Sequence, residues 1–278
     1  MLPLRIAAIE FLNAAPLMWG LEADARFSMV HTLPSACADR LRDGSADLGV
    51  IPVIELARIP GLVALQEMGV ASCDGEGAGA EVRSILLLSR CPLPQVRTLA
   101  LDRASRTSAA LAQILLRQRF GAEFTTCAGD ADWRRALGLA DAVLLIGDPA
   151  LRLRISGEAT AASGVQVHDL ALIWREWTGL PFVFALWAVR TEPFAEARGW
   201  LRARLLQALE QGIAGREELV ATWAPRLFLP PQEIRRYLTA NVAHRISARH
   251  VQGLRQFFSM ASEADLVPRQ ALTSLVTA

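Results

Sequence analysis

One pattern recurs along this chain and limits the folds open to it: a short apolar segment, a polar turn, and then a segment rich in helix-forming residues. In one example, the apolar run Thr98–Leu101 precedes a turn rich in hydroxyl groups and the helical pattern of residues 109–116. Similar alternations begin at Arg5, Ser28, Leu48 and Ala142. Since parallel strands need a long, usually helical crossover, the alternation predicts an α/β fold with mixed, largely parallel sheets.

The polar turns after these strands are the predicted ligand-binding edge. In parallel sheets the carboxyl ends of the strands and the N-termini of the following helices meet at one edge, where ligands bind. Helix N-termini offer unpaired N–H groups and positive dipole ends, which suit a carboxylate or a phosphate. The turn residues expected there are Asn13, Ser35, Pro52, Ser105, Arg106, Thr107, Ser108, Gly147 and Asp148.

Two of these turns also have ordinary structural interpretations. Ser105 or Thr107 could simply cap a surface helix, or their turn could bind an anion with added charge from Arg103 and Arg106. Asp148 is followed by a proline, which is typical of an N-cap and the first helical residue. A single turn decides nothing, but the repetition of such turns favours a shared binding site.

The length of the chain and its proline residues predict two lobes. At 278 residues the chain exceeds a typical single core. Two prolines within residues 89–97 suggest the crossing to a second lobe, and we expect the return near residues 178–190. The predicted first lobe is discontinuous and the second is inserted, with a ligand cleft between them. Their boundaries are residues 1–90 plus 188–278, with C-terminal helices, and residues 91–187.

Composition argues against several classes of function. Hydrophobic residues make up 52% of the chain and charged residues 21%, which fits packed cores. A net charge of +1 gives no reason to expect nucleic acid or an anionic membrane as a partner. No apolar run is long enough to span a membrane. The chain has no lysine, which excludes a Schiff-base lysine and a Walker-type phosphate lysine.

Cysteine and histidine spacings predict no metal site. The four cysteines form no CxxC pair and the four histidines form no HExxH motif. The apolar N-terminal run is interrupted early by Glu10 and Asn13, which is unlike a signal peptide. We therefore expect a cytoplasmic protein with reduced thiols and no metal.

Seven segments carry a resemblance that spans nearly the whole chain. They are Phe11–Leu17, Pro34–Ala38, Asp47–Val53, Ser84–Arg90, Asp102–Ser108, Leu145–Leu151 and Trp177–Trp187. In order and spacing they resemble the chorismate dehydratases of the futalosine route to menaquinone. The resemblance implies a type II periplasmic-binding-protein fold, used by a cytoplasmic lyase that needs no cofactor. It also implies a reaction that turns chorismate into 3-[(1-carboxyvinyl)oxy]benzoate and water.

The same resemblance implies roles for particular residues. Asn13 and Ser84 would make the central polar contacts to the substrate, as the catalytic pair. The turn from Ser105 to Ser108 would bind a carboxylate, and Asp148 would either cap its helix or assist the departing hydroxyl. Because the matched turns supply mostly Asn and Ser rather than a general base, we expect the enolpyruvyl carboxylate of the substrate to remove the proton itself.

Three departures from the family pattern bear on this interpretation. The family usually has Tyr where Phe11 stands. The glycine-rich loop 72–80 is longer than usual and is followed by Glu81–Arg83 in place of small residues. Residues 171–173 replace a more polar stretch. These changes bear on a substrate contact, on closure of the cleft and on solvent access.

Two other functions stay open at this point. The first is the later dihydroxynaphthoate synthase of the same pathway and fold, although that family uses a catalytic histidine and none of the four histidines lies in a matched turn. The second is a non-catalytic solute-binding protein. The residues do not predict an oligomeric state.

Overall fold

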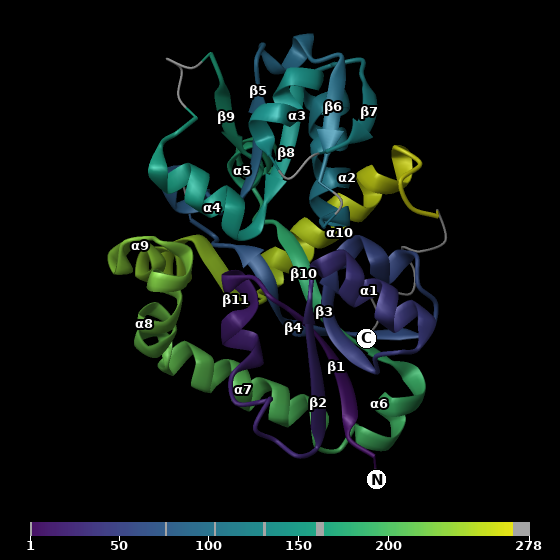
Figure 1. Ribbon diagram of the computed structural model, residues 1–278. Helices are drawn as coiled ribbons and strands as arrows, with labels where there is room; N and C mark the ends of the chain where they lie inside the picture. The colour runs from purple at the N-terminus through teal and green to yellow at the C-terminus, as the bar shows by residue number, and fades with distance from the viewer. Residues whose placement is uncertain (1, 76, 103, 130–131, 160–163, 269–278) are drawn as a thin grey trace.

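The computed structural model describes residues 2–75, 77–102, 104–129, 132–159 and 164–268. Arg103 and Glu76, to which the predicted anion site and glycine-rich loop extend, lie outside these ranges. The described chain forms two lobes, each built around its own sheet with helices packed against it (Figure 1). The expected two-lobed α/β fold is confirmed.

The first lobe contains a six-stranded sheet in the order β11-β4-β10-β3-β1-β2. Its strands are β1 (Leu4–Ile9), β2 (Phe27–Thr32), β3 (Leu48–Pro52), β4 (Leu62–Ser72), β10 (Val183–Arg190) and β11 (Val242–Arg245). Its helices are α1 (Pro34–Asp43), α6 (Thr191–Ala197), α7 (Leu201–Ala214), α8 (Arg216–Leu227), α9 (Pro231–Arg236), the 3-10 helices η1 (Leu12–Met18) and η2 (Val53–Ala57), and the π-helix η7 (Tyr237–Asn241).

The second lobe contains a five-stranded sheet in the order β7-β6-β8-β5-β9. Its strands are β5 (Ile85–Ser89), β6 (Thr98–Leu101), β7 (Thr125–Ala128), β8 (Ala142–Ile146) and β9 (Gln166–Asp169). Its helices are α2 (Arg106–Ile114), which continues into the π-helix η5 (Leu115–Arg119), α3 (Trp133–Leu139), α4 (Gly147–Ser156) and α5 (Leu170–Thr178). Two short 3-10 turns, η3 (Gly77–Ala80) and η4 (Leu93–Gln95), flank β5 in sequence.

The C-terminal helix α10 (Ala248–Glu263) packs against both lobes. It contacts α2 in the second lobe and β10 in the first, and it lies across their junction (Figure 1). A capping box between Ser247 and His250 begins it, and the ring of His250 also bonds to the carbonyl of Ser72 at the end of β4, with 2.9 Å from Nε2 to O. The first turn of α10 is therefore hydrogen-bonded to the first sheet, and the rest of the helix packs against both lobes.

Alternating side chains of β5 and β8 divide the hydrophobic core. Ile85 and Leu87 belong to a large apolar cluster that extends through both lobes, whereas Leu86 and Leu88 belong to a smaller cluster confined to the second lobe. Neighbouring residues of a strand point to opposite faces of its sheet, so one strand supplies both clusters. This explains why every residue of β5 and β8 is buried and why all of them except Ser89 are apolar.

The structure places the crossings between lobes earlier than the sequence suggested. Because β5 pairs with β8 and β9, it belongs to the second lobe, and the crossing lies within residues 73–84 rather than 89–97. The whole of β10 pairs in the first sheet, so the predicted boundary at residue 187 cuts through a strand of the first lobe. A strand buried on both faces carries no sequence signal of the sheet that it joins.

The sheets contain more antiparallel pairing than expected. In the described ranges, four strand pairs are parallel and five are antiparallel. Every antiparallel pair includes β5, β10 or β11. The strand β11 also interrupts a region that we expected to be wholly helical.

The starts and ends of several helices follow from local chemistry. Pro34 occupies the first turn of α1, and Gly44 ends it at a φ of 78°, a conformation that favours glycine. The helical segment that follows β1 is the 3-10 helix η1, with Pro16 inside it. Among the described residues, no helix combines the length and apolar character needed to cross a membrane.

Candidate active site

The two lobes meet around a small cavity at the predicted edge of the sheets. Its volume is about 30 Å³, which leaves room for little more than a water molecule. Three of its lining residues, Ile9, Pro52 and Ile146, end β1, β3 and β8. The described residues that line it are Ile9, Phe11, Asn13, Pro34, Pro52, Val70, Ile85, Ser105, Ser108, Ile146, Gly147, Phe184 and Ala185.

A wider hollow on the surface lies away from this edge. Its volume is about 570 Å³, and its lining includes Leu4, Arg5 and Asp47. Leu4 and Arg5 begin β1, whereas Ile9 at the small cavity ends the same strand. We place the candidate site at the smaller cavity because ligands of such sheets bind beyond the carboxyl ends of the strands.

Asn13 presents an unsatisfied oxygen at this cavity. Its Oδ1 atom is buried and has no hydrogen-bond partner among the described residues, an arrangement that is rare in folded proteins. Its backbone carbonyl is 2.7 Å from Nε2 of His244. Burial lowers the pKa of His244 to about 4, so the ring is neutral near pH 7 and donates Nε2–H to that carbonyl. The backbone of Asn13 is therefore held while its amide oxygen stays free.

Ser84 lies behind the cavity rather than in its lining. Its side chain is fully buried, and its Oγ accepts a hydrogen bond from the phenol of Tyr237 at 2.7 Å. Its carbonyl accepts a hydrogen bond from the N–H of Gly147 at 2.8 Å. The preceding residue, Arg83, has a φ of 61° and donates its N–H to Asp169 at 2.6 Å. Hydrogen bonds to its hydroxyl, to its carbonyl and to the N–H of the preceding residue therefore hold Ser84 in place. The next residue, Ile85, lines the cavity.

In the turn at the start of α2, the serine side chains line the cavity, whereas the threonine side chain contacts the first lobe. Ser105 caps the helix by accepting the N–H of Ser108 at 3.3 Å, and both serines line the cavity. They share a face because they are three residues apart on a helix. Ser108 Oγ is buried without a partner among the described residues. Thr107 points elsewhere, and its Oγ1 accepts the N–H of Ile54 in the first lobe at 3.3 Å.

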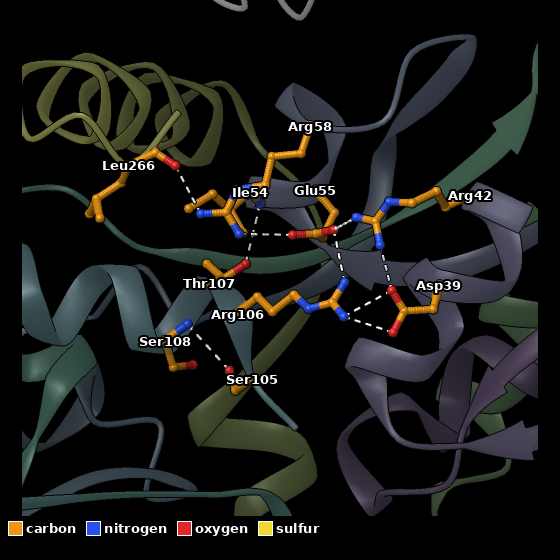
Figure 2. A network of polar contacts seen from close by, with 10 residues as sticks. All are labelled: Asp39, Arg42, Ile54, Glu55, Arg58, Ser105, Arg106, Thr107, Ser108 and Leu266. Atoms are coloured by element: carbon orange, nitrogen blue, oxygen red, sulfur yellow. Dashed lines mark hydrogen bonds and ion pairs between the residues drawn. The ribbon is translucent and has the colours of Figure 1, made fainter. Parts of the chain in front are cut away.

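Arg106 bridges the lobes. Its guanidinium donates to Asp39 at 2.7 Å and to Glu55 at 2.9 Å, both in the first lobe (Figure 2). Glu55 is completely buried and also pairs with Arg42 and Arg58. Substrate binding by Arg106 stays a prediction, and in this structure two carboxylates already balance its charge.

The remaining predicted residues also lie at the junction of the lobes. The N–H of Ser35, in the first turn of α1, donates to the carbonyl of Ala104 in the second lobe at 3.1 Å. Gly147 has a φ of 67°, and a Cβ atom there would lie 2.7 Å from the ring of Phe11. Glycine therefore allows both the turn and the close approach of the aromatic ring.

Asp148 contacts the opposite lobe. Because Ile146 is the N-cap of α4, Asp148 lies inside the first turn, so its interpretation as an N-cap is wrong. Its Oδ1 accepts the N–H of Leu12 at 3.1 Å. Burial raises the pKa of this carboxyl to about 6.

Among the described residues that line the cavity, none has an ionisable side chain. Its walls offer amide, hydroxyl and backbone groups, and the N-terminal turns of α1, α2 and α4 meet there through Pro34, Ser105 and Gly147. These three helices have nine or ten residues each. Within the described ranges, no group of three His, Cys, Asp or Glu side chains is placed to hold a metal ion. The three helix N-termini and the uncharged polar groups of the walls together suit a small anionic ligand.

Comparison with known families decides where the chain belongs. Residues 4–263 match the model of a family described as menaquinone biosynthesis. The chain is a member of this family. A chorismate dehydratase of Thermus thermophilus is 29% identical over 274 residues, which cover 92% of this chain and 94% of that protein.

Solved structures confirm the fold of this family member. A protein from Archaeoglobus fulgidus has a TM-score of 0.71 at 17% identity, covering 95% of this chain and 98% of its own. The periplasmic aliphatic sulphonate binding protein of Escherichia coli has a TM-score of 0.67 at 20% identity, covering 100% and 92%. The predicted periplasmic-binding-protein-like fold is therefore confirmed.

Sequence reasoning missed two residues that support the candidate site. The sequence pattern assigns no role to Tyr237 or His244, yet Tyr237 bonds to Ser84 and His244 to Asn13. Both belong to the C-terminal part of the chain, which the alternating pattern does not cover. A signal did exist, because Tyr237 is the single tyrosine of the sequence and a buried phenol needs a partner.

Proposed function

We propose that this member of the menaquinone biosynthesis family is a chorismate dehydratase, a carbon–oxygen lyase that works in the cytoplasm without a cofactor. The observation that carries the proposal is the family match over residues 4–263, together with the named relative from Thermus thermophilus. The product would be 3-[(1-carboxyvinyl)oxy]benzoate.

The reaction removes one water molecule from the ring of chorismate. A proton leaves the carbon that bears the enolpyruvyl ether, and the C–H electron pair forms a new ring double bond. The neighbouring C–O bond breaks, and its hydroxyl leaves with the bonding pair and takes up a proton to become water. Since the ring becomes aromatic, the driving force lies in the substrate, and the protein has mainly to orient the groups that react.

The walls of the cavity support a base supplied by the substrate. General acid–base catalysis calls for a positioned ionisable side chain, and the part of the lining that the structure describes has none. In our proposal the enolpyruvyl carboxylate takes the proton, while Asn13 and Ser84 make the polar contacts that fix its geometry. Ser108, whose hydroxyl lacks a partner among the described residues, contacts a carboxylate at the start of α2.

Substrate entry requires the lobes to separate. Pockets for small molecules have volumes of about 300–1,000 Å³, so a cavity of about 30 Å³ is too small for chorismate. The contacts that must loosen include those of Arg106 with Glu55, Thr107 with Ile54, and Asp148 with Leu12. Closure over the substrate then excludes water from the reacting groups.

A direct assay tests this function. Purified protein with chorismate and a metal chelator should lose substrate and form the benzoate product. Asn13→Ala and Ser84→Ala should lower kcat strongly while remaining folded, whereas Ser28→Ala, on an exposed position of β2, should match the wild type. Binding of chorismate without turnover would favour the solute-binding alternative, and absence of binding would remove the proposed substrate.

A further inference from the structure

The 3-10 helix η1 receives its first hydrogen bond from the opposite lobe. Leu12 begins this helix in the first lobe, and its N–H donates to Asp148 Oδ1 of α4 in the second lobe at 3.1 Å. The residue before it, Phe11, has no side-chain group to cap the helix. Asn13 is the next residue of the same helix, so the contact lies one peptide bond from the candidate catalytic amide.

The hydrogen bond from Leu12 to Asp148 is unusual because its acceptor lies far from the helix in sequence. The first N–H groups of a helix have no partner within it, and the side chain of the preceding residue commonly supplies one. Here the oxygen comes from 136 positions further along the chain. The start of η1 is therefore complete only when the lobes are closed.

Asn13 is thus held from two directions. His244 bonds to its carbonyl from β11, within the first lobe, and this contact does not depend on closure. Asp148 fixes the N–H of Leu12 from across the cleft, and this contact forms only on closure. The bond from His244 fixes the backbone just after the Asn13 side chain, at the Asn13 carbonyl. The bond to Asp148 fixes the backbone just before it, at the Leu12 N–H.

We propose that Asp148 is a positioning residue that aligns Asn13 for reaction when the lobes close, and that it acts by accepting a hydrogen bond rather than by transferring a proton. This inference rests on the proposed function, because it assigns Asp148 a part in the same reaction. It gives closure a second effect besides excluding water, since the active arrangement of Asn13 is completed by the moving lobe.

Charged and titratable groups surround the Asp148 carboxyl. Arg152 lies on its own helix and Arg226 on α8, and both favour the ionised form, whereas Glu10 disfavours it. The phenol of Tyr237 on η7 feels the Asp148 charge as well. A pH profile alone would therefore mix several groups, and the test needs a substitution that keeps the oxygen but removes the charge.

Two substitutions, Asp148→Asn and Asp148→Ala, distinguish hydrogen-bond acceptance by Asp148 from proton transfer. The amide oxygen of Asn can still accept the N–H of Leu12, whereas Ala offers no acceptor. We expect Asp148→Asn to keep kcat within about threefold of the wild type and Asp148→Ala to lower it at least about tenfold, with a smaller change in KM. Amide hydrogen exchange of Leu12 provides a readout independent of turnover: it should accelerate about tenfold in Asp148→Ala and stay near wild type in Asp148→Asn.

Asp132→Ala is a matched control. Asp132 caps α3 in the same lobe by accepting the N–H of Arg134 at 2.9 Å, so its loss should lower stability without changing the exchange of Leu12 or kcat. Equal loss of kcat in Asp148→Asn and Asp148→Ala would assign the carboxyl to proton transfer and overturn the inference. Unchanged exchange of Leu12 in Asp148→Ala would overturn it too. An inactive wild type with the expected exchange pattern would instead refute the proposed function and leave the closure-dependent cap of η1 established.

Discussion

The phenol of Tyr237 donates a hydrogen bond to the hydroxyl of Ser84 at 2.7 Å, and both side chains are buried. Serine has one proton to donate and two lone pairs to accept with. When Tyr237 occupies one lone pair, Ser84 keeps its own proton to donate, and in our proposal the acceptor is a substrate oxygen. The π-helix η7 begins at Tyr237, and π-helices occur often at functional sites.

Tyr237→Phe should lower kcat about tenfold and change KM less, because it removes one neutral hydrogen bond that orients Ser84. The ring stays in place, so near-native packing is expected, with a loss of about 1 kcal/mol in the free energy of unfolding. Steady-state kinetics and denaturant unfolding would measure both quantities. Unchanged kcat in a folded variant would reduce Tyr237 to a core residue.

Ser108→Ala and Ser105→Ala should have opposite signatures. Since Ser108 Oγ has no partner among the described residues, its removal should leave stability unchanged or slightly higher while raising KM for chorismate about tenfold. Ser105→Ala removes the N-cap of α2 and should cost about 1 kcal/mol. Thermal unfolding and KM values for the two variants would check this contrast. Equal KM values in Ser108→Ala and wild type would argue against a carboxylate at this turn.

Glu55→Gln should be among the more destabilising conservative changes in this chain. Glu55 is completely buried and pairs with Arg42, Arg58 and Arg106, so its loss removes the carboxylate that these three partly exposed guanidinium groups share. Because water still reaches the arginines, we expect a cost of about 2 kcal/mol, less than for a fully buried ion pair. A double-mutant cycle with Arg106→Gln should show strong coupling in denaturant unfolding. Additive effects would mean that the two side chains act independently.

Asp148→Asn should stabilise the protein in a pH-dependent way. The folded pKa is about 6, whereas an unfolded Asp titrates near about 3.9. The folded chain therefore binds more protons between these values, so the contribution of Asp148 is fully present below about pH 4 and is lost as the pH rises through about 6. The variant should gain about 2 kcal/mol over the wild type on going from pH 4 to pH 7.

The comparison is clean because His244 and Asp169 titrate equally in both proteins. Melting temperatures of the variant and the wild type over this range provide the measurement. A stability difference that stays constant with pH would contradict the raised pKa of Asp148.

Repetition in the sequence was enough to predict the α/β fold and to propose the edge at which the candidate site lies. Each strand and the turn after it are local features, so Asn13, Ser105 and Gly147 could be placed before their mutual contacts were known. The partners of side chains are set by tertiary packing, which a local pattern does not contain. Arg106 looked suited to an anion because nothing in its neighbourhood of the sequence reveals Asp39 and Glu55.

The lobe boundaries were misplaced for a related reason. The prolines at residues 92 and 94 seemed to mark a linker, but they lie inside the second lobe, in the connection from β5 to β6. The strands β5 and β10 are apolar except for their last residues, Ser89 and Arg190, so only their pairing tells which sheet each one joins. Roles for Tyr237 and His244 were missed because their partners lie more than 150 positions away in sequence.

The apolar cluster that runs through both lobes makes them poor candidates for separate existence. If the second lobe were produced alone, one face of its strands β5 and β8, which is buried in the intact molecule, would be exposed to water. The two lobes should accordingly melt together, in a single calorimetric peak whose van't Hoff and calorimetric enthalpies agree. If the lobes separate for substrate entry as we propose, they move as two bodies in a chain that folds as one.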